Sequence, residues 1–381
     1  MGGAANRCLG VLAASDESIL SGDSEPFLRK LCLLGAEEGV DVRVFTPDSV
    51  SWEENSVDGY HFPADKARWE QRHFLLPPLI YDRCFCSSPA DFLVYRRLLA
   101  QLRDQPGIRL LGGGLRGKWD VQRLLAADSV LRPHLALTCM LRTLRQLQAW
   151  LHIRSEAFLK PEAGTHGKGT LHIAQLGKNS SLYRVKGRDR SNRLVEMEFT
   201  DTSALFGWIR KFIEGRRYLL QEYLPLTTAD GIAYDVRSLM QKNGRGSWEL
   251  TGTAVRCGDE GSVTSNLHGG GSSCEADAFL QEQFGRSAAS GILDTITALS
   301  YRIPLVLESS HGRLAELGID YGVCRDGRIR ILEVNSKPGR AAFRSLSDGE
   351  TARLAVCNPV RYAAFLLKSQ RAAAGATSLG G

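Results

Sequence analysis

The chain has 381 residues, of which 43% are hydrophobic and 24% are charged, and its formal net charge is +6. This length exceeds one ordinary hydrophobic core and predicts two or three domains of a globular protein. No run of about 18 apolar residues is present, so no membrane-spanning helix is expected. The basic residues are scattered along the sequence and do not indicate nucleic-acid binding.

The N-terminal third alternates short apolar runs with amphipathic helical patterns. Residues 8–14 are expected to form the first strand rather than a targeting segment, because Asp16 and Glu17 follow without a clear cleavage site. This βα alternation predicts a small Rossmann-like parallel sheet with helices on its faces over residues 1–113. The expected strands are 9–13, 42–45, 79–84 and 108–111, and the expected helices are 26–38 and 89–103.

Three glycines at 112–114 mark a domain boundary. Residues 114–220 are expected to contain linker helices over 118–154, strands around a glycine-rich loop, and a helix at 203–213. Residues 221–370 are expected to form a larger subdomain of α+β character, with strands at 236–241 and 248–256, helices at 276–283 and 288–300, and a C-terminal hairpin. Residues 371–381 are rich in Ala, Gly and Ser and predict a disordered tail.

Nine cysteines are spread along the chain without a CxxC pair, the closest two being Cys84 and Cys86. A zinc site or a disulfide framework would need closer and more regular spacing. Reduced cysteines in a cytoplasmic protein are therefore expected.

A glycine-rich loop follows the strand that ends at Lys160. It contains Gly164, Gly167 and Gly169, with Lys168 between the last two. Glycines allow backbone N–H groups to approach phosphate oxygens closely, although a simple hairpin turn would use the same residues. The loop is not a Walker A motif, which would need Ser or Thr directly after its lysine.

Lysine usage favours phosphate binding. Only 11 of the 48 basic residues are lysine, and Lys118, Lys160, Lys168 and Lys337 all occupy positions that look like motifs. A compact ammonium suits phosphate. Four solvated surface lysines are the alternative.

The strand at 218–224 carries a polar pair, Gln221 and Glu222, just before a proline. Such a segment can form a hinge between two subdomains, with backbone groups available to a purine ring, or an ordinary edge strand. Further on, Asp235 and Arg237 share one face of a strand and point either into a site or into a salt bridge.

The C-terminal hairpin brings together hard oxygen donors. Two apolar strand patterns are joined by an Asp326-Gly327 turn. Glu333 and Asn335 are two residues apart and share a face, and Asp320 lies on the partner strand. Carboxylate and amide oxygens suit Mg²⁺, which is usually held by one or two carboxylates together with substrate phosphates.

Taken in chain order, these motifs resemble the ATP-grasp fold. Among enzymes the pattern is similar to that of the ribosomal-protein glutamate ligases, and over residues 118 to 345 it is more similar still to the YheC/YheD-type proteins associated with spore coats. The motifs that carry the resemblance are Gly117-Lys118-Trp119-Asp120, Phe158-Leu159-Lys160-Pro161, Gln221-Glu222-Tyr223, Asp235-Val236-Arg237, Ser265-Asn266-Leu267-His268, and Asp320 with Glu333-Val334-Asn335-Ser336-Lys337-Pro338.

The resemblance implies that ATP lies between two subdomains together with Mg²⁺, or Mn²⁺ as an alternative. It implies roles for the following residues: Lys118, Lys160, Asn266 and the loop with Gly164, Gly167, Lys168 and Gly169 at the phosphates; Gln221, Glu222, Tyr223 and Leu224 at the adenine; Asp235 near the ribose; and Asp320, Glu333 and Asn335 at the metal. Arg237 and Arg256 would face the transferred phosphoryl group or the carboxylate substrate, and with Lys160 they are the implied catalytic residues.

Two positions depart from these families. Thr264 stands where the glutamate ligases carry Arg, which puts one phosphate or substrate contact in doubt, and Ala136 replaces a proline usual in the spore-type proteins. The implied activity is ATP-dependent ligation of an unidentified carboxylate donor to an amine acceptor, such as an amino acid, peptide or protein, through an acyl phosphate. A non-catalytic nucleotide-binding protein of the spore coat and an ATP-grasp kinase remain alternatives.

Overall fold

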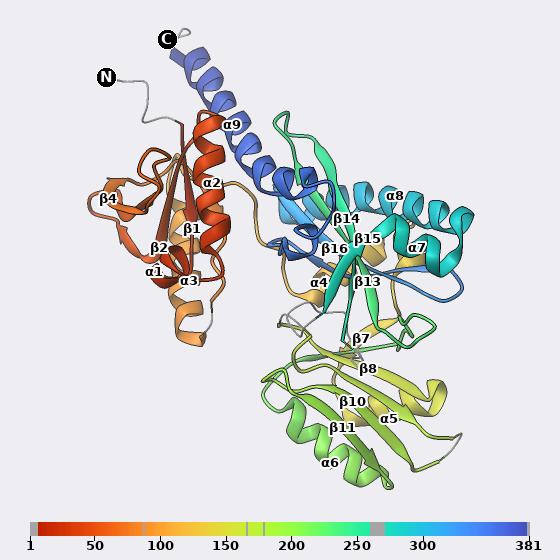
Figure 1. The fold of residues 1–381 in the computed structure, drawn as a ribbon. Coiled ribbons are helices and arrows are strands. Elements are labelled where there is room, and N and C mark those ends of the chain that lie inside the picture. The colour runs from red at the N-terminus through yellow and green to blue at the C-terminus, as the bar shows by residue number, and fades with distance from the viewer. Residues whose placement is uncertain (1–6, 87, 165–166, 178–179, 260–270, 379–381) are drawn as a thin grey trace.

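The computed structural model describes residues 7–86, 88–164, 167–177, 180–259 and 271–378. Three β-sheets define an N-terminal domain, a small subdomain and a large subdomain. Figure 1 shows the N-terminal domain beside the large subdomain, with the small subdomain on the far side of the large sheet from the two chain ends. Within the described residues, no helix is both long enough and apolar enough to cross a lipid bilayer.

The N-terminal sheet is mixed and has the strand order β4-β3-β2-β1-β5-β6. Strands β2, β1, β5 and β6 run parallel to one another as predicted, whereas β3 and β4 add an antiparallel extension that was not predicted. Polar residues dominate β4, an exposed edge strand, so no apolar alternation marks it. The strands are β1 (Cys8–Leu12), β2 (Asp41–Ser51), β3 (Ser56–His61), β4 (Glu70–Leu75), β5 (Leu79–Asp82) and β6 (Arg109–Leu110).

Helices cover both faces of this sheet. Helices α2 and α9 pack on one face, and α3 packs on the other. Pro89 opens α3 directly after Ser88, whose side chain accepts from the Asp91 backbone in a capping box. The helices here are α1 (Asp16–Leu20), α2 (Glu25–Glu37), α3 (Pro89–Asp104) and the chain-terminal α9 (Glu350–Ser378).

Helix α9 brings the end of the chain back to its beginning. Val356, Val360 and Leu367 join Leu9 and Val11 of β1 in one buried cluster. The same helix also packs on the large sheet through Ala355, the subdomain to which the sequence assigned this segment. The helix continues through residues 371–378, where a disordered tail was predicted. Alanine, which is frequent in this stretch, has the highest intrinsic helix propensity.

The small subdomain is an antiparallel sheet of order β11-β10-β9-β8-β12-β7 with α5 and α6 on one face. Strand β7 lies in a stretch that was predicted to be helical, and it is only half buried. The elements are β7 (Thr138–Leu141), α5 (Leu144–Arg154), β8 (Glu156–Pro161), β9 (Leu171–Gln175), β10 (Tyr183–Arg188), β11 (Leu194–Phe199), α6 (Thr202–Ile213) and β12 (Tyr218–Gln221).

The large subdomain has the strand order β15-β14-β13-β16-β17. Helices α4, α7 and α8 pack on one face, and α9 with a short 3-10 helix (Ala341–Phe343) packs on the other. Helix α4, expected to be a linker, buries Val121 and Leu125 in this core. The elements are α4 (Lys118–Ala127), a 3-10 turn (Arg132–His134), β13 (Tyr234–Lys242), β14 (Trp248–Cys257), β15 (Ser272–Glu275), α7 (Ala276–Phe284), α8 (Arg286–His311), β16 (Glu316–Val323) and β17 (Ile329–Asn335).

A buried carboxylate joins the N-terminal domain to the large subdomain. Glu316 at the start of β16 is 2% exposed. Its oxygens accept from the Tyr81 hydroxyl at 2.5 Å, from Arg83 at 3.0 Å, from Gln241 at 3.0 Å and from Arg340 at 2.5 Å. Two guanidiniums and two neutral donors therefore compensate one buried charge, as burial of a carboxylate requires.

A second link is made by Lys337, just past the end of β17. Its ammonium donates to Asp82 Oδ1 at 2.7 Å, to the Cys84 carbonyl at 2.9 Å and to the Tyr95 hydroxyl at 2.9 Å. Asp82 stands at the carboxyl end of β5. The segment that follows Glu333 and Asn335 is thereby fastened to the N-terminal domain.

We expect Lys337→Met to lower the free energy of unfolding by about 2 kcal/mol, because the mostly buried Asp82 carboxylate loses its cation. Hydrogen exchange should also quicken at β5 and the first turn of α3. Lys66→Met is the matched control, since the pair of Lys66 with Glu70 is more exposed than that of Lys337 with Asp82 and Glu70 keeps Arg72 as a second cation, and it should cost less than about 1 kcal/mol. If urea titrations gave the same loss of unfolding free energy for both variants, Lys337 would not link the two domains.

Candidate functional site

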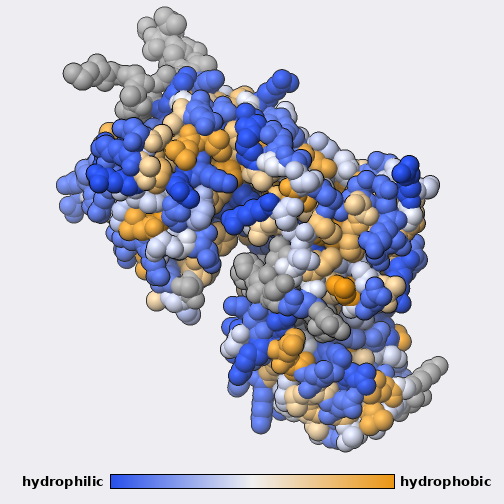
Figure 2. All heavy atoms as spheres, in the orientation of Figure 1, coloured by the Kyte–Doolittle hydropathy of each residue, from blue (hydrophilic) through white to orange (hydrophobic). Residues whose placement is uncertain are grey.

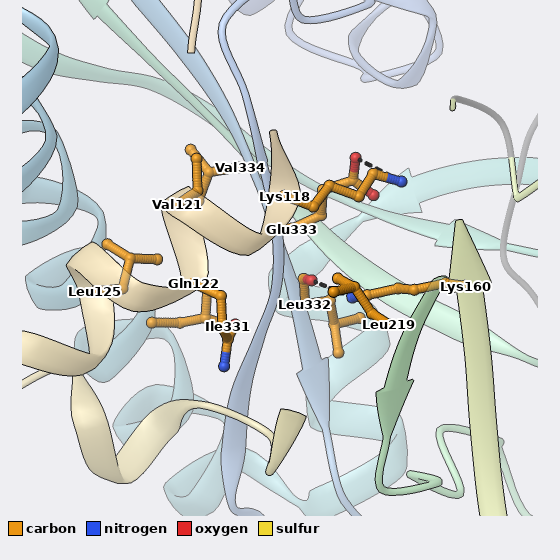
Figure 3. Close-up of a pocket in the computed structure, with 10 residues that line it drawn as sticks. All are labelled: Lys118, Val121, Gln122, Leu125, Lys160, Leu219, Ile331, Leu332, Glu333 and Val334. Atoms are coloured by element: carbon orange, nitrogen blue, oxygen red, sulfur yellow. Dashed lines mark hydrogen bonds and ion pairs between the residues drawn. The ribbon is translucent and has the colours of Figure 1, made fainter. Parts of the chain in front are cut away.

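A small cleft lies where strands β8 and β12 of the small subdomain meet β17 and α4 of the large one. Figure 3 shows lysines and a glutamate at one end of it and aliphatic side chains along the rest. Most of the aliphatic side chains belong to the buried core of the large subdomain, so the charged end is the part that can accept anionic groups. The lining residues are Lys118, Val121, Gln122, Leu125, Lys160, Leu219, Ile331, Leu332, Glu333 and Val334.

Lys160 crosses the cleft from β8, where it stands opposite Leu219 of β12. Its ammonium donates to the Leu332 carbonyl of β17 at 3.2 Å. Burial, and next the charge of Lys118, lower the pKa of Lys160 to about 8, while Glu333 and Asp320 oppose the shift. Burial thus disfavours the charged form of this lysine, and an anionic ligand would stabilise that form.

Lys118 approaches from the first residue of α4. Its ammonium lies 3.4 Å from Glu333 Oε1, and both side chains are partly exposed. Gln122 follows one helical turn later and lines the same cleft. Two lysines from separate elements thus converge with one carboxylate, which leaves a positive excess at the charged end.

Next to this cleft, two arginines and two aspartates form a buried network on one face of the large sheet. Arg237 and Asp320 face each other in cross-strand register on β13 and β16 and make a two-pronged ion pair. Asp235 of β13 and Arg256 of β14 form a second two-pronged ion pair, in which Nε and Nη2 of Arg256 lie 2.7 and 2.6 Å from the two carboxylate oxygens of Asp235. All four residues are no more than 9% exposed.

Arg256 also joins the two pairs, because its guanidinium lies 3.1 Å from Asp320 Oδ2. Burial by itself would raise the pKa of Asp320, but the charges of Arg237 and Arg256 outweigh it and hold the pKa below its usual value. Asp320 is therefore ionised at neutral pH. The network presents guanidinium groups whose charge is balanced by carboxylates from the same sheet.

The three predicted metal ligands share one face of the hairpin. Asp320 pairs in register with Glu333, and Asn335 lies two residues further along β17. A carboxylate has about four acceptor sites, and guanidinium N–H groups occupy three of those of Asp320. One site on Asp320, with the oxygens of Glu333 and Asn335, forms a donor set that fits Mg²⁺ when phosphates complete the shell.

The protein alone does not supply a full metal cage. Within the described part of the chain, no group of three or more His, Cys, Asp and Glu side chains is arranged to hold an ion. Mg²⁺ usually keeps water and phosphate ligands rather than an all-protein shell. The donor set thus suits an ion that arrives with a nucleotide.

The glycine loop has the backbone conformation that its composition predicts. Gly164, Gly167 and Gly169 all have positive φ angles, of 149°, 68° and 75°. A Cβ on Gly169 would also lie 3.1 Å from the Tyr218 hydroxyl. Lys168, within this loop, is exposed.

The predicted hinge is held to the small subdomain. Gln221 donates to Thr138 Oγ1 at 2.7 Å. The Glu222 backbone N–H donates to the Leu137 carbonyl, and its carboxylate accepts from the Leu137 N–H at 2.9 Å. The segment at 221–224 thus leaves β12 as a fixed crossing towards the large subdomain.

An aromatic stack borders this hinge. The ring of Tyr223 lies on His172 of β9, with centroids 3.5 Å apart and planes 10° apart. His172 is also 3.0 Å from Glu156 Oε1. Burial lowers the pKa of His172 more than the Glu156 charge raises it, so a neutral imidazole stacks on the phenol.

Sequence reasoning missed some residues of this site. Leu219 and Leu332 gave no polar signal, and the Leu332 carbonyl that accepts from Lys160 carries no side-chain signature. Gln122 could have been found from its spacing of four residues after Lys118. Asn266, together with Thr264 and His268, lies outside the described residues, so its predicted place at the phosphates stays a prediction.

A family model described as YheC/D-like ATP-grasp matches residues 107–366 of the chain. The chain belongs to the YheC/D-like ATP-grasp family. The match covers the cleft, the buried network and the hairpin, and it confirms the fold and the family that the ordered motifs predicted.

Two curated members of this family are similar to the chain over most of their length. The endospore coat-associated protein YheC of Bacillus subtilis (strain 168) is 29% identical over 336 residues, which are 88% of this chain and 90% of YheC. The endospore coat-associated protein YheD of the same organism is 24% identical over 345 residues, covering 90% of this chain and 74% of YheD.

One solved structure shares the architecture of this chain. The D-cycloserine synthetase DcsG superposes with a TM-score of 0.51 at 15% identity and covers 95% of this chain and 99% of its own. At this identity the similarity speaks for the architecture alone. It extends through the N-terminal domain, since nearly the whole of both chains is covered.

Proposed function

We propose that this YheC/D-like ATP-grasp protein binds ATP with Mg²⁺ and ligates a carboxylate to an amine, releasing ADP and phosphate. The observation that carries the proposal is that four cations from two sheets and one helix converge at one place. Lys160 and Lys118 border the cleft, and Arg237 and Arg256 lie beside it within the buried network. Such an array suits a polyphosphate and a second anion.

The proposed reaction has two steps. An oxygen of the substrate carboxylate attacks the γ-phosphorus and the bond to the bridging oxygen breaks, giving an acyl phosphate and ADP. A neutral amine then attacks the acyl carbon, phosphate leaves with the C–O bonding electrons, and the amine proton passes to water. Neither step needs a covalent bond to the protein, so positioning and charge neutralisation can supply the catalysis.

The chain's own residues would share these tasks. Lys160 and Lys118 would bind phosphate oxygens, and the backbone of the glycine loop would border them. Arg237 would face the transferred phosphoryl group or the carboxylate. When bound by Asp320, Glu333 and Asn335, Mg²⁺ would neutralise charge on the phosphates.

We expect Glu333→Gln to remove most of the Mg²⁺-dependent binding of ATP. Among the described residues Glu333 makes one ion pair, and 29% of its side chain is exposed, so the fold should survive. Wild-type protein at an ATP concentration of about 100 times Kd should gain about 2.7 kcal/mol against unfolding. The variant should need at least about tenfold more ATP for the same gain, measured by thermal unfolding with Mg²⁺ or with EDTA.

Glu196→Gln is the control, because Glu196 makes a similar single ion pair with Lys186 on the small subdomain. Wild-type protein that ATP does not stabilise, with or without Mg²⁺, would refute the proposal. Binding without ADP release in the presence of carboxylates and amines would instead support the alternative of a nucleotide-binding structural protein. A phosphorylated product without ligation would identify a kinase.

A further inference from the structure

A group of seven basic residues surrounds the base of the glycine loop on the small subdomain. We call it the basic rim. It comes from two segments, the turn between β10 and β11 and the end of α6 with the start of β12. Its members are Arg188, Arg190, Arg193, Arg210, Lys211, Arg216 and Arg217.

Backbone hydrogen bonds hold both segments against the glycine loop. The Gly169 N–H donates to the Asp189 carbonyl at 3.2 Å, and the Glu162 N–H donates to the Arg217 carbonyl at 3.0 Å. Arg190 connects the two segments, because its guanidinium donates to the carbonyls of Phe212 at 3.1 Å and Glu214 at 2.6 Å. The rim is therefore one surface.

The positive charge of the rim is only partly compensated. Two carboxylates within its segments, Asp189 and Glu214, and one in the adjoining loop, Glu162, leave an excess of four charges, where the whole chain has +6. Asp189 forms an ion pair with Arg193, and Glu162 forms one with Arg217.

Four of the rim cations have no carboxylate partner among the residues that the structure describes. Arg190 bonds to carbonyls at the end of α6, where a cation is favoured by the helix dipole. Arg210, Lys211 and Arg216 are exposed and form no ion pair within the described chain. A surface of this kind attracts an anionic partner and speeds its association.

The neighbouring strand offers contacts that suit an extended peptide. Strand β11 begins directly after Arg193 and is the outer strand of its sheet, so its far edge pairs with no described strand. Leu194 and Met197 on this strand are 66% and 37% exposed. An extended peptide can add to such an edge through its backbone.

A single-stranded nucleic acid fits this surface less well. Base stacking on exposed aromatic rings is the usual source of affinity for single strands. The large exposed hydrophobic residues described in the small subdomain are all aliphatic: Ile153, Leu182, Leu194 and Met197. Figure 2 shows hydrophilic surface along the side of this subdomain that borders the hollow beneath the N-terminal domain.

We propose that the basic rim and the edge of β11 bind an acidic, extended peptide segment of a protein partner. The contacts are ion pairs from Arg210, Lys211 and Arg216 to its carboxylates. The binding does not require ATP, and its failure would leave the proposed ligase activity untouched. Because the rim adjoins the glycine loop, the same surface would hold a peptide substrate near the cleft.

The test measures binding of a fluorescein-labelled peptide of alternating Asp and Ser to the full chain by anisotropy, at low salt and without ATP. In the double variant with Lys211→Glu and Arg216→Glu, the affinity should fall at least about tenfold. The control double variant carries Arg245→Glu and Arg286→Glu, two equally exposed cations of the large subdomain. It changes the net charge by the same amount and should stay within about twofold of wild type.

Three results would overturn the proposal. One is an affinity that the rim variant retains while circular dichroism shows it folded. Another is an equal loss in both double variants, which would mean attraction by net charge alone. The third is tighter binding of a labelled oligothymidylate than of the peptide, with the same sensitivity to the rim variant, which would assign the surface to nucleic acid.

Discussion

Replacing Asp320 by Asn is expected to destabilise the fold by about 3–5 kcal/mol, which is the usual cost of removing one partner from a buried ion pair. The carboxylate is 7% exposed and compensates Arg237 and Arg256 together. Without it, two buried guanidiniums would share Asp235 alone. Urea unfolding followed by circular dichroism would measure the loss.

The pH dependence of this contribution has a definite sign. The pKa of Asp320 is lowered in the folded protein, so the unfolded chain takes up protons first as the pH falls below about 4. The stabilisation is complete at neutral pH and disappears only in acid, as the pH drops towards the folded pKa. The difference in stability between wild type and Asp320→Asn should shrink over that range.

Asp326→Asn is the matched control for this prediction. Asp326 also pairs with an arginine, Arg328, and lies in the turn of the same hairpin, but both side chains are more than half exposed. Its replacement should cost less than about 1 kcal/mol. Similar losses in the two variants would show that the buried network does not stabilise the sheet.

This prediction affects how activity data on Asp320 are interpreted. A loss of ATP turnover in Asp320→Asn would not by itself identify a metal ligand, because the variant also loses a structural charge. Glu333→Gln separates the two effects, since Glu333 is partly exposed and bonded only to Lys118 within the described chain.

Lys160→Met should weaken ATP binding by at least about a hundredfold, or about 3 kcal/mol, because a charge-assisted bond to phosphate is lost inside the cleft. The apo protein should remain folded, since methionine fills similar volume and the ammonium has only the Leu332 carbonyl as its described hydrogen-bond partner. Isothermal calorimetry at neutral pH would measure the affinity.

The lowered pKa of Lys160 adds a second readout. Above pH 8 the folded apo protein holds this lysine mostly neutral, so binding of an anionic ligand should draw a proton from the buffer. At pH 9 the binding heat of the wild type should vary with the ionisation enthalpy of the buffer. In Lys160→Met this variation should be absent.

Stability should follow the same linkage. The unfolded lysine has a pKa of about 10.4, above the folded value, so the unfolded chain binds more protons between pH 8 and about 10.4. The free energy of unfolding contributed by Lys160 therefore rises with pH over this window. Lys186→Met, which removes a partly exposed lysine of β10, should change neither the ATP affinity nor the proton uptake.

Local patterns predicted the hairpin and the glycine loop well. The Asp326-Gly327 turn is found as expected, with Gly327 at a φ of 78°, and it places Asp320 opposite Glu333. Turn chemistry and a period of two are properties of neighbouring residues, so one sequence suffices to read them.

Pairing between distant strands could not be predicted in the same way. Asp235 and Arg237 were expected to point together into a site or into a salt bridge. Both do lie in salt bridges, and the partners are residues of adjacent strands, Arg256 for Asp235 and Asp320 for Arg237. These partners depend on the registers of β13 with β14 and β16, and nothing in the local sequence specifies a register between strands so far apart.

The full extent of the N-terminal domain could not be predicted from local sequence patterns either. Strands β3 and β4 extend its sheet with mostly polar residues, and α9 reaches it from the other end of the chain. An amphipathic helix shows that one face is buried, but not which domain covers it.

The return of α9 has a consequence for biosynthesis. The apolar face of the first sheet is covered by α2 and by Val356, Val360, Ala363 and Leu367 of α9, which are made long after β1 and β2. While the middle of the chain is being translated, part of this apolar face remains exposed to solvent. This face can therefore be fully buried only after α9, which follows every other described helix and strand in the chain, has been synthesised.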